Sequence, residues 1–316
     1  MHPHVPRISL GLPAYMAAKW IGSCLESALA QTVSEFELII SDNCSTDETY
    51  AIVQRFAERD SRIRAFRQAE NVGITANHNF TYLQASAPYF CWLSATDIYH
   101  PEFLARCLKA IESAPDVVLA APRASTFFET PGDGQLLAEN RLPEVQDPRR
   151  QLFAVMSATL GTSLFRGVYR RSAIGNRIPL QPIFGNDLLL VVEMAATGRV
   201  VQIDEPLYYE RVSAGARTAE VPLYMRAQYY EPAIGVSCIL FHRMRVQMRY
   251  WGIAMRNAKG IRESLCTAGS MLRVMVDLHR MATRDTREAL GLAWAMASTR
   301  RLRAGTLRSR TSSRRS

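Results

Sequence analysis

The sequence predicts an α/β fold with a mostly parallel central sheet, followed by a helical C-terminal region. Over residues 7–121, short apolar runs alternate with segments of helical periodicity, which is typical of βαβ units. The run at residues 89–93 is almost entirely apolar or aromatic, as expected of a strand buried on both faces. From about residue 223 the pattern is helical almost throughout.

In the first half, five apolar runs are predicted strands: residues 7–12, 36–40, 62–66, 89–93 and 116–121. Helices are expected between them. The first helix is indicated by apolar residues on one face: Trp20, Ile21, Cys24, Leu25, Ala28 and Leu29. Ser45 with Glu48 is typical of a capping box, and Pro101 suits the first turn of a helix. A further helix is expected over residues 74–85.

The second half begins with a polar segment rich in Pro and Gly, residues 125–147, for which loops or a hairpin are expected. The later predicted elements are helices at residues 150–160 and 188–197 and short strands at residues 200–203 and 207–211. We therefore expect one domain over residues 1–220, with halves at about 7–121 and 122–220, then a helical region over 221–304 and a basic disordered tail over 305–316.

The composition is that of a globular protein, with 48% hydrophobic and 21% charged residues. No apolar stretch approaches the roughly 20 residues of a membrane helix, and the N-terminal residues lack a signal-peptide pattern. A cytoplasmic location is therefore expected, and peripheral association with the inner face of the membrane is left open. The six cysteines form no metal-binding motif.

The net charge of +9 resides mainly in the last quarter of the chain, where residues 241–316 contain 17 Lys and Arg against 4 Asp and Glu. Basic helices of this kind can lie on an anionic membrane surface, or they can cover the preceding domain with their arginines in solvent. Nucleic-acid binding is disfavoured because no recognition motif accompanies the charge.

Ligands of open α/β sheets bind beyond the carboxyl ends of the strands, where loops and helix N-termini present donors. Three polar clusters follow predicted strands, at residues 13–15, 41–47 and 94–97. We expect these clusters to form one ligand-binding edge.

Five segments also resemble successive blocks of family 2 glycosyltransferases: RISLGLPAY, QTVSEFELIISDNCSTDET, RDSRIRAFRQAENVGITANHNF, YFCWLSATDIYHPEFL and GNDLLLVVEMAATGRVVQIDEPLYYERVSAGA. The resemblance covers roughly residues 7–215. It implies a glycosyltransferase-A fold of two Rossmann-like halves, the first binding a nucleoside diphosphate sugar and the second the acceptor. It also implies a hexosyl-type transfer with inversion in polysaccharide biosynthesis.

The resemblance places the nucleotide-sugar contacts on the first half of the chain, with Arg211 added from the second. Asp42 occupies the position of the residue that hydrogen-bonds the base, although an isolated Asp before a helix also commonly caps a turn. Tyr15 matches the loop around the base and ribose, with a packed aromatic as the alternative. The other residues expected at this site are Pro13, Asn43, Asn77, Ser94 and Arg211.

The metal site implied by the resemblance is incomplete. The family usually has paired acidic residues after the fourth strand, whereas here Asp97 follows Thr96. Mg²⁺ or Mn²⁺ at Asp97 is expected to neutralise the diphosphate leaving group, since Mg²⁺ often uses only one or two carboxylates. Arg211 stands near a position where relatives have a His, and it is expected to bind the diphosphate, with a surface ion pair as the alternative.

Asp187 is the expected general base. It precedes an apolar helix and matches the acidic residue that the family places before its acceptor-side helix; helix N-capping is the alternative. The expected acceptor is a hydroxyl of a glycan, lipid-linked or small molecule. The loss of the second acidic residue keeps open a degenerate relative that binds nucleotide sugar without transferring it. A nucleotidyltransferase is disfavoured because the first loop is neither Gly-rich nor basic.

Overall fold

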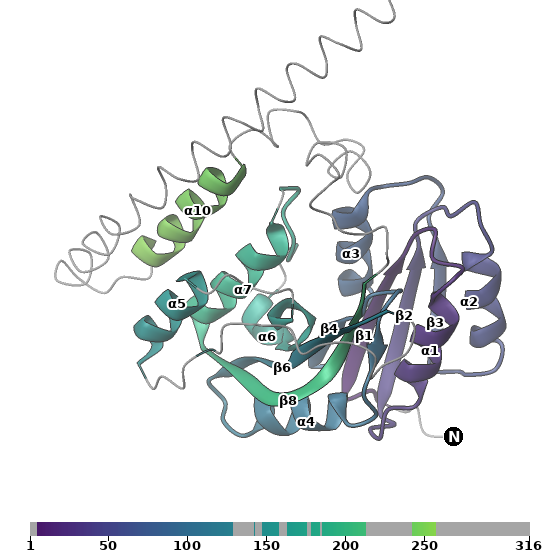
Figure 1. The fold of residues 1–316 in the computed structure, drawn as a ribbon, viewed down its shortest axis with the longest axis horizontal. Helices are drawn as coiled ribbons and strands as arrows, with labels where there is room; N and C mark the ends of the chain where they lie inside the picture. The colour runs from purple at the N-terminus through teal and green to yellow at the C-terminus, as the bar shows by residue number, and fades with distance from the viewer. Residues whose placement is uncertain are drawn as a thin grey trace, which may run out of the picture. The chain divides into compact units, whose positions relative to one another are not determined.

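The computed structural model describes residues 5–128, 142, 147–157, 163–175, 178–183, 185–212 and 242–256. The chain divides into two compact units, the first comprising Met1–Val221 with Tyr230–Ala233 and the second the remaining C-terminal residues. The first unit contains an eight-stranded sheet in the order β3-β2-β1-β4-β7-β6-β8-β5 (Figure 1). The predicted α/β class is therefore confirmed.

The strands are β1 Ile8–Ala14, β2 Phe36–Asp42, β3 Ile63–Arg67, β4 Tyr89–Trp92, β5 Ile98–Tyr99, β6 Val117–Phe127, β7 Val168–Arg170 and β8 Arg199–Arg211. From β3 to β4 every neighbouring pair is parallel, as is the pair β6–β8. Strand β7 joins these two parts through antiparallel pairing with β4 and β6, and β5 pairs antiparallel with β8.

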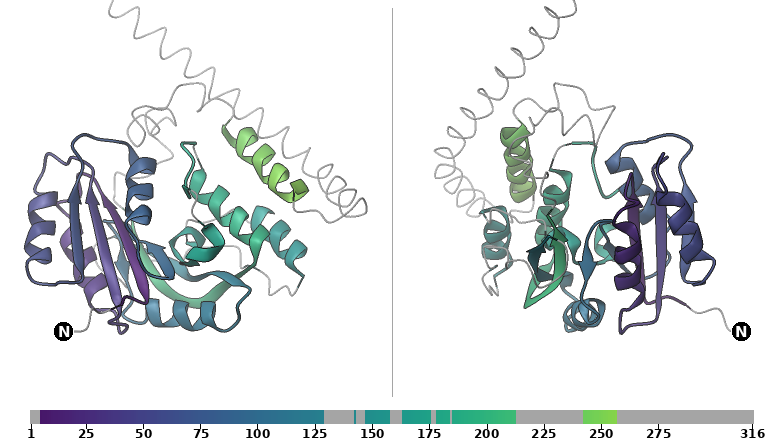
Figure 2. Two further views of the ribbon diagram at one scale, coloured as in Figure 1. Left: turned by 180° about the vertical axis from the view of Figure 1, so that it is seen from behind. Right: turned by 45° about the vertical axis from the view of Figure 1, so that its right-hand side comes forward.

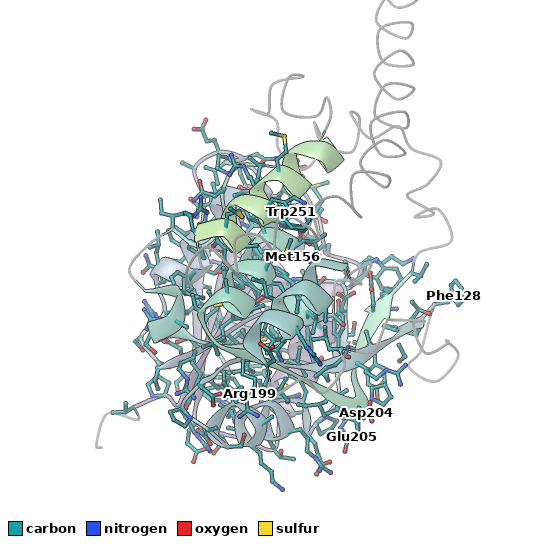
Figure 3. The ribbon with its side chains drawn as sticks, turned by 90° about the vertical axis from the view of Figure 1, so that its left-hand side faces the viewer. Phe128, Met156, Arg199, Asp204, Glu205 and Trp251 are labelled. Carbon is teal, nitrogen blue, oxygen red and sulfur yellow. The ribbon has the colours of Figure 1, made fainter. Side chains whose placement is uncertain are left out.

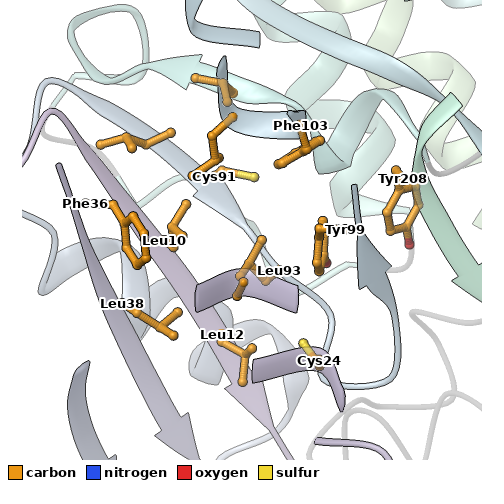
Figure 4. Packing of buried hydrophobic residues seen from close by; sticks show 14 of the residues in the cluster. Leu10, Leu12, Cys24, Phe36, Leu38, Cys91, Leu93, Tyr99, Phe103 and Tyr208 are labelled. Carbon is orange, nitrogen blue, oxygen red and sulfur yellow. The ribbon is translucent and has the colours of Figure 1, made fainter. Parts of the chain in front are cut away.

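Helices α1 Ile21–Leu29, α2 Thr49–Ala57 and α4 Phe103–Glu112 contribute side chains to the main hydrophobic cluster, and so cover one face of the sheet. Alternate residues of β1 face them, namely Ile8, Leu10 and Leu12, each at most 1% exposed. Figure 4 shows Leu10, Leu12 and Leu38 of the strands in this cluster, with Tyr99 and Tyr208 farther along the sheet. Strands β1 and β2 therefore rest on a hydrophobic core.

Helix α3 Ile74–Leu83 packs against β1 from the other face (Figure 2). A Cβ atom at Gly11 would lie 2.5 Å from Thr81 Oγ1 and 2.6 Å from the ring of Phe90. The absence of a side chain at Gly11 therefore lets α3 approach β1 closely. The other elements of this part of the unit are α5 Pro148–Ser157, the 3₁₀ helix η1 Leu164–Arg166, α6 Arg171–Ile174 and α7 Asn186–Thr197.

The sequence-based elements differ from the structure in several places. Strand β8 is continuous where two strands were predicted, and β6 continues to Phe127, inside the predicted loop segment. The pairing of β6 with β8 shifts register on both sides of Arg123, the partner of Pro206, so an irregularity in the ladder accommodates that proline within one strand. The Ser45–Glu48 capping box is wrong, because α2 begins at Thr49 and Ser45 Oγ accepts the amide of Met16 instead.

Much of the predicted helical region, residues 221–304, and all of the predicted tail, residues 305–316, lie outside the described residues, as do residues 129–141. Helix α10, His242–Arg256, is the described part of the second unit. No helix within the described ranges has the length and apolar character required to span a bilayer.

Candidate active site

The first two predicted polar clusters meet at the carboxyl ends of β1 and β2. The parallel register pairs Ala14 with Asp42, so the loops that follow the two strands begin side by side. The loops are bridged by a backbone hydrogen bond from Asn43 N to Ala14 O, 2.8 Å, and by one from Met16 N to the side-chain Oγ of Ser45, 3.0 Å. The two loops therefore form one connected surface.

Two residues in these facing loops adopt left-handed backbone conformations that non-glycine residues rarely occupy, Met16 with φ 50° and Cys44 with φ 60°. The neighbouring contacts hold them there: Ala17 N donates to Thr49 Oγ1 at 2.8 Å and Ala18 N to Asp47 Oδ2 at 3.1 Å. Such strain is retained where the surrounding structure fixes it and is common at ligand sites.

Asp42, at the end of β2, is fully buried. Its Oδ2 accepts the amide of Ser45 at 3.1 Å and lies 3.5 Å from Arg67 Nε. Its Oδ1 is buried and has no hydrogen-bond partner in the described part of the chain. Asp42 thus holds the turn that follows it, as the capping alternative implied, and also keeps one acceptor atom unsatisfied. An unsatisfied buried acceptor is rare in native structures, because it loses water without gaining a partner.

The side chains of Asn43 and Asn77 make hydrogen bonds within the protein. Asn43 Nδ2 donates to Asn71 at 2.8 Å, and its Oδ1 accepts the amide of Val72 at 2.9 Å. Asn77 exchanges hydrogen bonds with the side chain and carbonyl of Ser41 at 2.6 and 2.9 Å. These contacts fix the end of β2 and so position Asp42; direct nucleotide contact by either residue stays a prediction. Pro13 is half-buried in β1, and Tyr15 is 37% exposed.

Asp97 lies after β4 and is 4% exposed. Its Oδ2 accepts the hydroxyl of Tyr208 at 2.5 Å, while its Oδ1 accepts the amide of Arg211 at 3.1 Å and the hydroxyl of Thr96 at 3.0 Å. Ser94 Oγ is 3.0 Å from Thr96 Oγ1 in the same network. Asp97 therefore joins the loop after β4 to the end of β8.

This network bears on the predicted metal. Both oxygens of Asp97 are used by protein donors, and the neighbouring Thr96 supplies a hydroxyl instead of a second carboxylate. Within the residues that the structure describes, no three His, Cys, Asp or Glu side chains gather into a group that could hold a metal ion. Since hard divalent cations are bound through carboxylate and other oxygens, this donor set does not fit a protein-held Mg²⁺ or Mn²⁺ well. The metal at Asp97 stays a prediction.

Arg211, at the end of β8, stacks between two rings, with its guanidinium carbon 4.2 Å from the centroid of Trp20 and 4.4 Å from that of Phe127. Its Nε donates to Thr96 O at 2.9 Å, and its Nη1 to Phe128 O at 3.3 Å. The surface ion pair weighed as an alternative is therefore not its main environment. A role toward the diphosphate stays a prediction.

Arg211→Lys should destabilise the first unit by about 1–2 kcal/mol, because an ammonium cannot reproduce the planar stacking and the forked donors. Urea unfolding followed by circular dichroism measures this. Arg55→Lys, at an exposed position on α2, is the matched control and should leave the midpoint unchanged. Equal midpoints for the two variants would mean that the stacking contributes nothing.

Asp187 lies in the first turn of α7, one residue inside the helix, whose N-cap is Gly185 at φ 79°. Asp187 is therefore not the N-cap residue of α7, which was the alternative to a role as general base, and the helix has no side-chain hydrogen bond at its N-cap. Asn186 anchors this end of α7 by donating to Thr75 Oγ1 and to Gln181 O, both at 2.9 Å. Burial raises the pKa of Asp187, although its backbone surroundings and Arg166 act in the opposite direction. A carboxylate of raised pKa is a stronger base.

Sequence reasoning missed Arg166, the last residue of η1. Burial opposes its charge, but Tyr208, Tyr99, Asp97 and Glu210 interact with it electrostatically and raise its pKa overall. It also lowers the pKa of Asp187. Arg166 is therefore the cation that acts on both predicted carboxylates, Asp97 and Asp187, which are 90 residues apart in the sequence. No local motif marks it.

A mostly parallel sheet with polar loops side by side at the carboxyl ends of β1 and β2 is the arrangement expected of a glycosyltransferase-A fold. The comparisons specify the family. The description "Glycosyl transferase family 2" matches residues 9–174, more than half of the chain. The chain belongs to this family, and the predicted family and fold are confirmed.

Among individual proteins, the uncharacterized glycosyltransferase EpsJ of Bacillus subtilis is 25% identical over 243 residues, covering 73% of this chain and 66% of the relative. Chondroitin synthase of Escherichia coli is 36% identical over 104 residues, which are 33% of this chain and 15% of that enzyme. The chain thus matches a small part of the synthases.

The crystal structure of S. aureus TarS 1–349 in complex with UDP-GlcNAc has a TM-score of 0.57 and 16% identity, with 89% of each chain covered. The mannosyltransferase PcManGT from Pyrobaculum calidifontis, in complex with GDP-Man and Mn²⁺, has a TM-score of 0.52 and 14% identity, covering 90% of this chain and 85% of that one. At these identities the likeness concerns the fold.

Proposed function

We propose that this chain transfers a hexosyl group, with inversion, from a nucleoside diphosphate sugar to a hydroxyl of a glycan or lipid-linked acceptor. The observation that carries the proposal is the pairing of two features in a family 2 chain. One is Asp42, a buried carboxylate with an unsatisfied oxygen at the end of β2, and the other is Asp187, a carboxylate of raised pKa at the start of α7. The first would bind the donor and the second would activate the acceptor.

The unsatisfied Oδ1 of Asp42 supports a specific kind of base. A carboxylate oxygen accepts the N–H of uracil, thymine or guanine, whereas the corresponding ring nitrogen of cytosine is itself an acceptor. The TarS neighbour was crystallised with UDP-GlcNAc, and the relatives include chondroitin and hyaluronan synthases. We therefore favour a UDP-hexose donor and a role in polysaccharide synthesis.

In the proposed reaction, Asp187 accepts the proton of the acceptor hydroxyl as its oxygen forms a bond to the anomeric carbon of the sugar. The bond from that carbon to the diphosphate breaks, and its electron pair leaves with the diphosphate. Attack from the face opposite the leaving group inverts the configuration. Raising the pKa of Asp187 favours this proton transfer.

Isothermal titration of UDP, GDP, dTDP and CDP tests the donor assignment. UDP should bind most tightly and CDP should bind at least about tenfold more weakly, since N3 of cytosine carries no hydrogen to donate to Asp42 and its 4-amino group lies at a different position on the ring. At 100 times its dissociation constant, UDP should also stabilise the fold by about 2.7 kcal/mol. Equal affinity for UDP and CDP would contradict base recognition through Asp42.

A second candidate function is nucleotide-sugar binding without transfer, which the replacement of a paired acid by Thr96 favours. The two functions differ in turnover: a binding protein would retain UDP affinity but release no sugar from any donor, even slowly to water.

The proposal also includes association with the inner face of a membrane, through the basic C-terminal quarter of the sequence.

A further inference from the structure

Arg166 is held rigidly in place. Its neighbour Phe165 is buried and stacks on Trp92, with ring centroids 5.2 Å apart and an interplanar angle of 13°. A Cβ atom at Gly167 would lie 2.6 Å from Ala120 O, so the chain passes directly against β6 at this point. Arg166 N also donates to Ser163 O at 3.0 Å. The side chain thus starts from a fixed backbone between β4, β6 and α7.

Two nitrogens of the Arg166 guanidinium lack a partner. Nε and Nη1 are both buried and make no hydrogen bond with the residues that the structure describes. Its closest ring contact is with its own neighbour Phe165, 5.3 Å from guanidinium carbon to centroid. By contrast, Arg170 four residues later donates to the carbonyls of Val117 and Ile111 at 3.0 and 2.7 Å. Burying a guanidinium without hydrogen bonds is costly, because water is removed and nothing replaces it.

The surroundings point to an anion as the missing partner. Burial, with Arg166 nearby, lowers the pKa of His78 to about 3, so His78 is neutral and does not compete with Arg166 for an anion. The carboxylates that interact with Arg166 are Asp97, Glu210 and Asp187. Asp97 is already satisfied by Tyr208, Thr96 and Arg211, so it does not occupy the free guanidinium donors.

We infer that Arg166 binds the diphosphate of the donor through its free guanidinium donors, and that the site does not need a divalent cation to hold this diphosphate. Guanidinium binds phosphate oxygens in a two-pronged geometry and carries a permanent charge. It would therefore stabilise the charge that develops on the leaving diphosphate, in a protein whose Asp97 is occupied by protein donors. The inference rests on the proposed function, since it assumes a nucleoside diphosphate donor.

Titration calorimetry with UDP, uridine and inorganic pyrophosphate, in EDTA and in Mn²⁺, tests the inference. For the wild type, affinity for UDP in EDTA should be within about threefold of that in Mn²⁺. Arg166→Gln should weaken UDP and pyrophosphate by about 10- to 100-fold while changing uridine less than about twofold. Arg166→Lys keeps the charge but loses the two-pronged guanidinium geometry, so its affinity for UDP and pyrophosphate should lie between those of the wild type and Arg166→Gln. Arg55→Gln, exposed on α2, should match the wild type.

The outcomes separate the inference from the function on which it rests. UDP affinity unchanged in Arg166→Gln and lost in Arg211→Gln would overturn the role of Arg166 while leaving the proposed donor intact. A gain of more than about tenfold from Mn²⁺ would overturn the metal-independent part. Failure of the wild type to bind any nucleoside diphosphate would overturn both. Thermal melting of each variant identifies loss of folding, in which case Arg166→Lys decides by the same criterion.

Discussion

Replacing Asp187 with asparagine is expected to lower turnover by about 10³-fold while leaving the affinity for UDP within about threefold of the wild type. Asparagine has nearly the same shape but cannot accept a proton. The start of α7 should remain in place, because Asn186 and the backbone of the helix hold it. The measurement is release of UDP under saturating donor, together with calorimetry of UDP binding.

Asp204→Asn is the matched control, since Asp204 is an exposed aspartate of β8 (Figure 3). It should retain wild-type turnover. If Asp187→Asn also retained it, Asp187 would be a structural residue of the helix N-terminus and another group would have to serve as base.

The same carboxylate predicts the pH dependence. Burial raises the pKa of Asp187, so the carboxyl stays protonated to a higher pH than an exposed aspartate, and turnover should fall as the pH is lowered through this raised value. The groups that interact electrostatically with Asp187 are Arg166 of η1 and Tyr169 of β7. Because Arg166 lowers this pKa, Arg166→Gln should move the acidic limb to higher pH.

Asp42→Ala is expected to weaken UDP binding by about 30-fold, because a hydrogen bond between the base and a buried carboxylate contributes about 2 kcal/mol. Its effect on pyrophosphate binding should be small, which distinguishes loss of base recognition from loss of the site. Asp42→Asn, which keeps one acceptor oxygen but not the charge, should give a smaller loss.

Asp60→Asn serves as the control for Asp42. Asp60 forms its ion pair with Arg62 at the start of β3, with 2.7 Å between Nη2 and Oδ2. It should leave UDP affinity unchanged. If Asp42→Ala bound UDP as tightly as the wild type, its unsatisfied oxygen would not face the base.

The parts of the fold that the sequence predicted well are those whose pattern is local. Strand β1 is buried along almost its whole length, and helix α1 buries side chains at spacings of three to four residues; both patterns are legible in the sequence. Strands β5 and β7 have two and three residues and exist because of pairing with β8, β4 and β6. Such short segments carry no periodicity, so tertiary pairing alone defines them.

The candidate site shows the same division. Asp42, Asp97 and Asp187 were found because strand ends and family blocks mark them. Their hydrogen-bond partners could not be predicted, because Tyr208 and Arg211, which bond Asp97, are more than 100 residues away from it in the sequence. The family blocks led to Arg211 as the predicted diphosphate ligand and gave no signal for Arg166. In the structure Arg211 is stacked between two rings, whereas Nε and Nη1 of Arg166 have no hydrogen-bond partner among the described residues.

The central claim, inverting transfer from a nucleoside diphosphate sugar, is tested most directly by the configuration of the sugar first released when water replaces the acceptor. Proton NMR during the first minutes, before mutarotation, should show the β-anomer released from an α-linked UDP-hexose by the wild type and little release by Asp187→Asn. Initial release of the α-anomer, or no release from any donor that binds, would contradict the account.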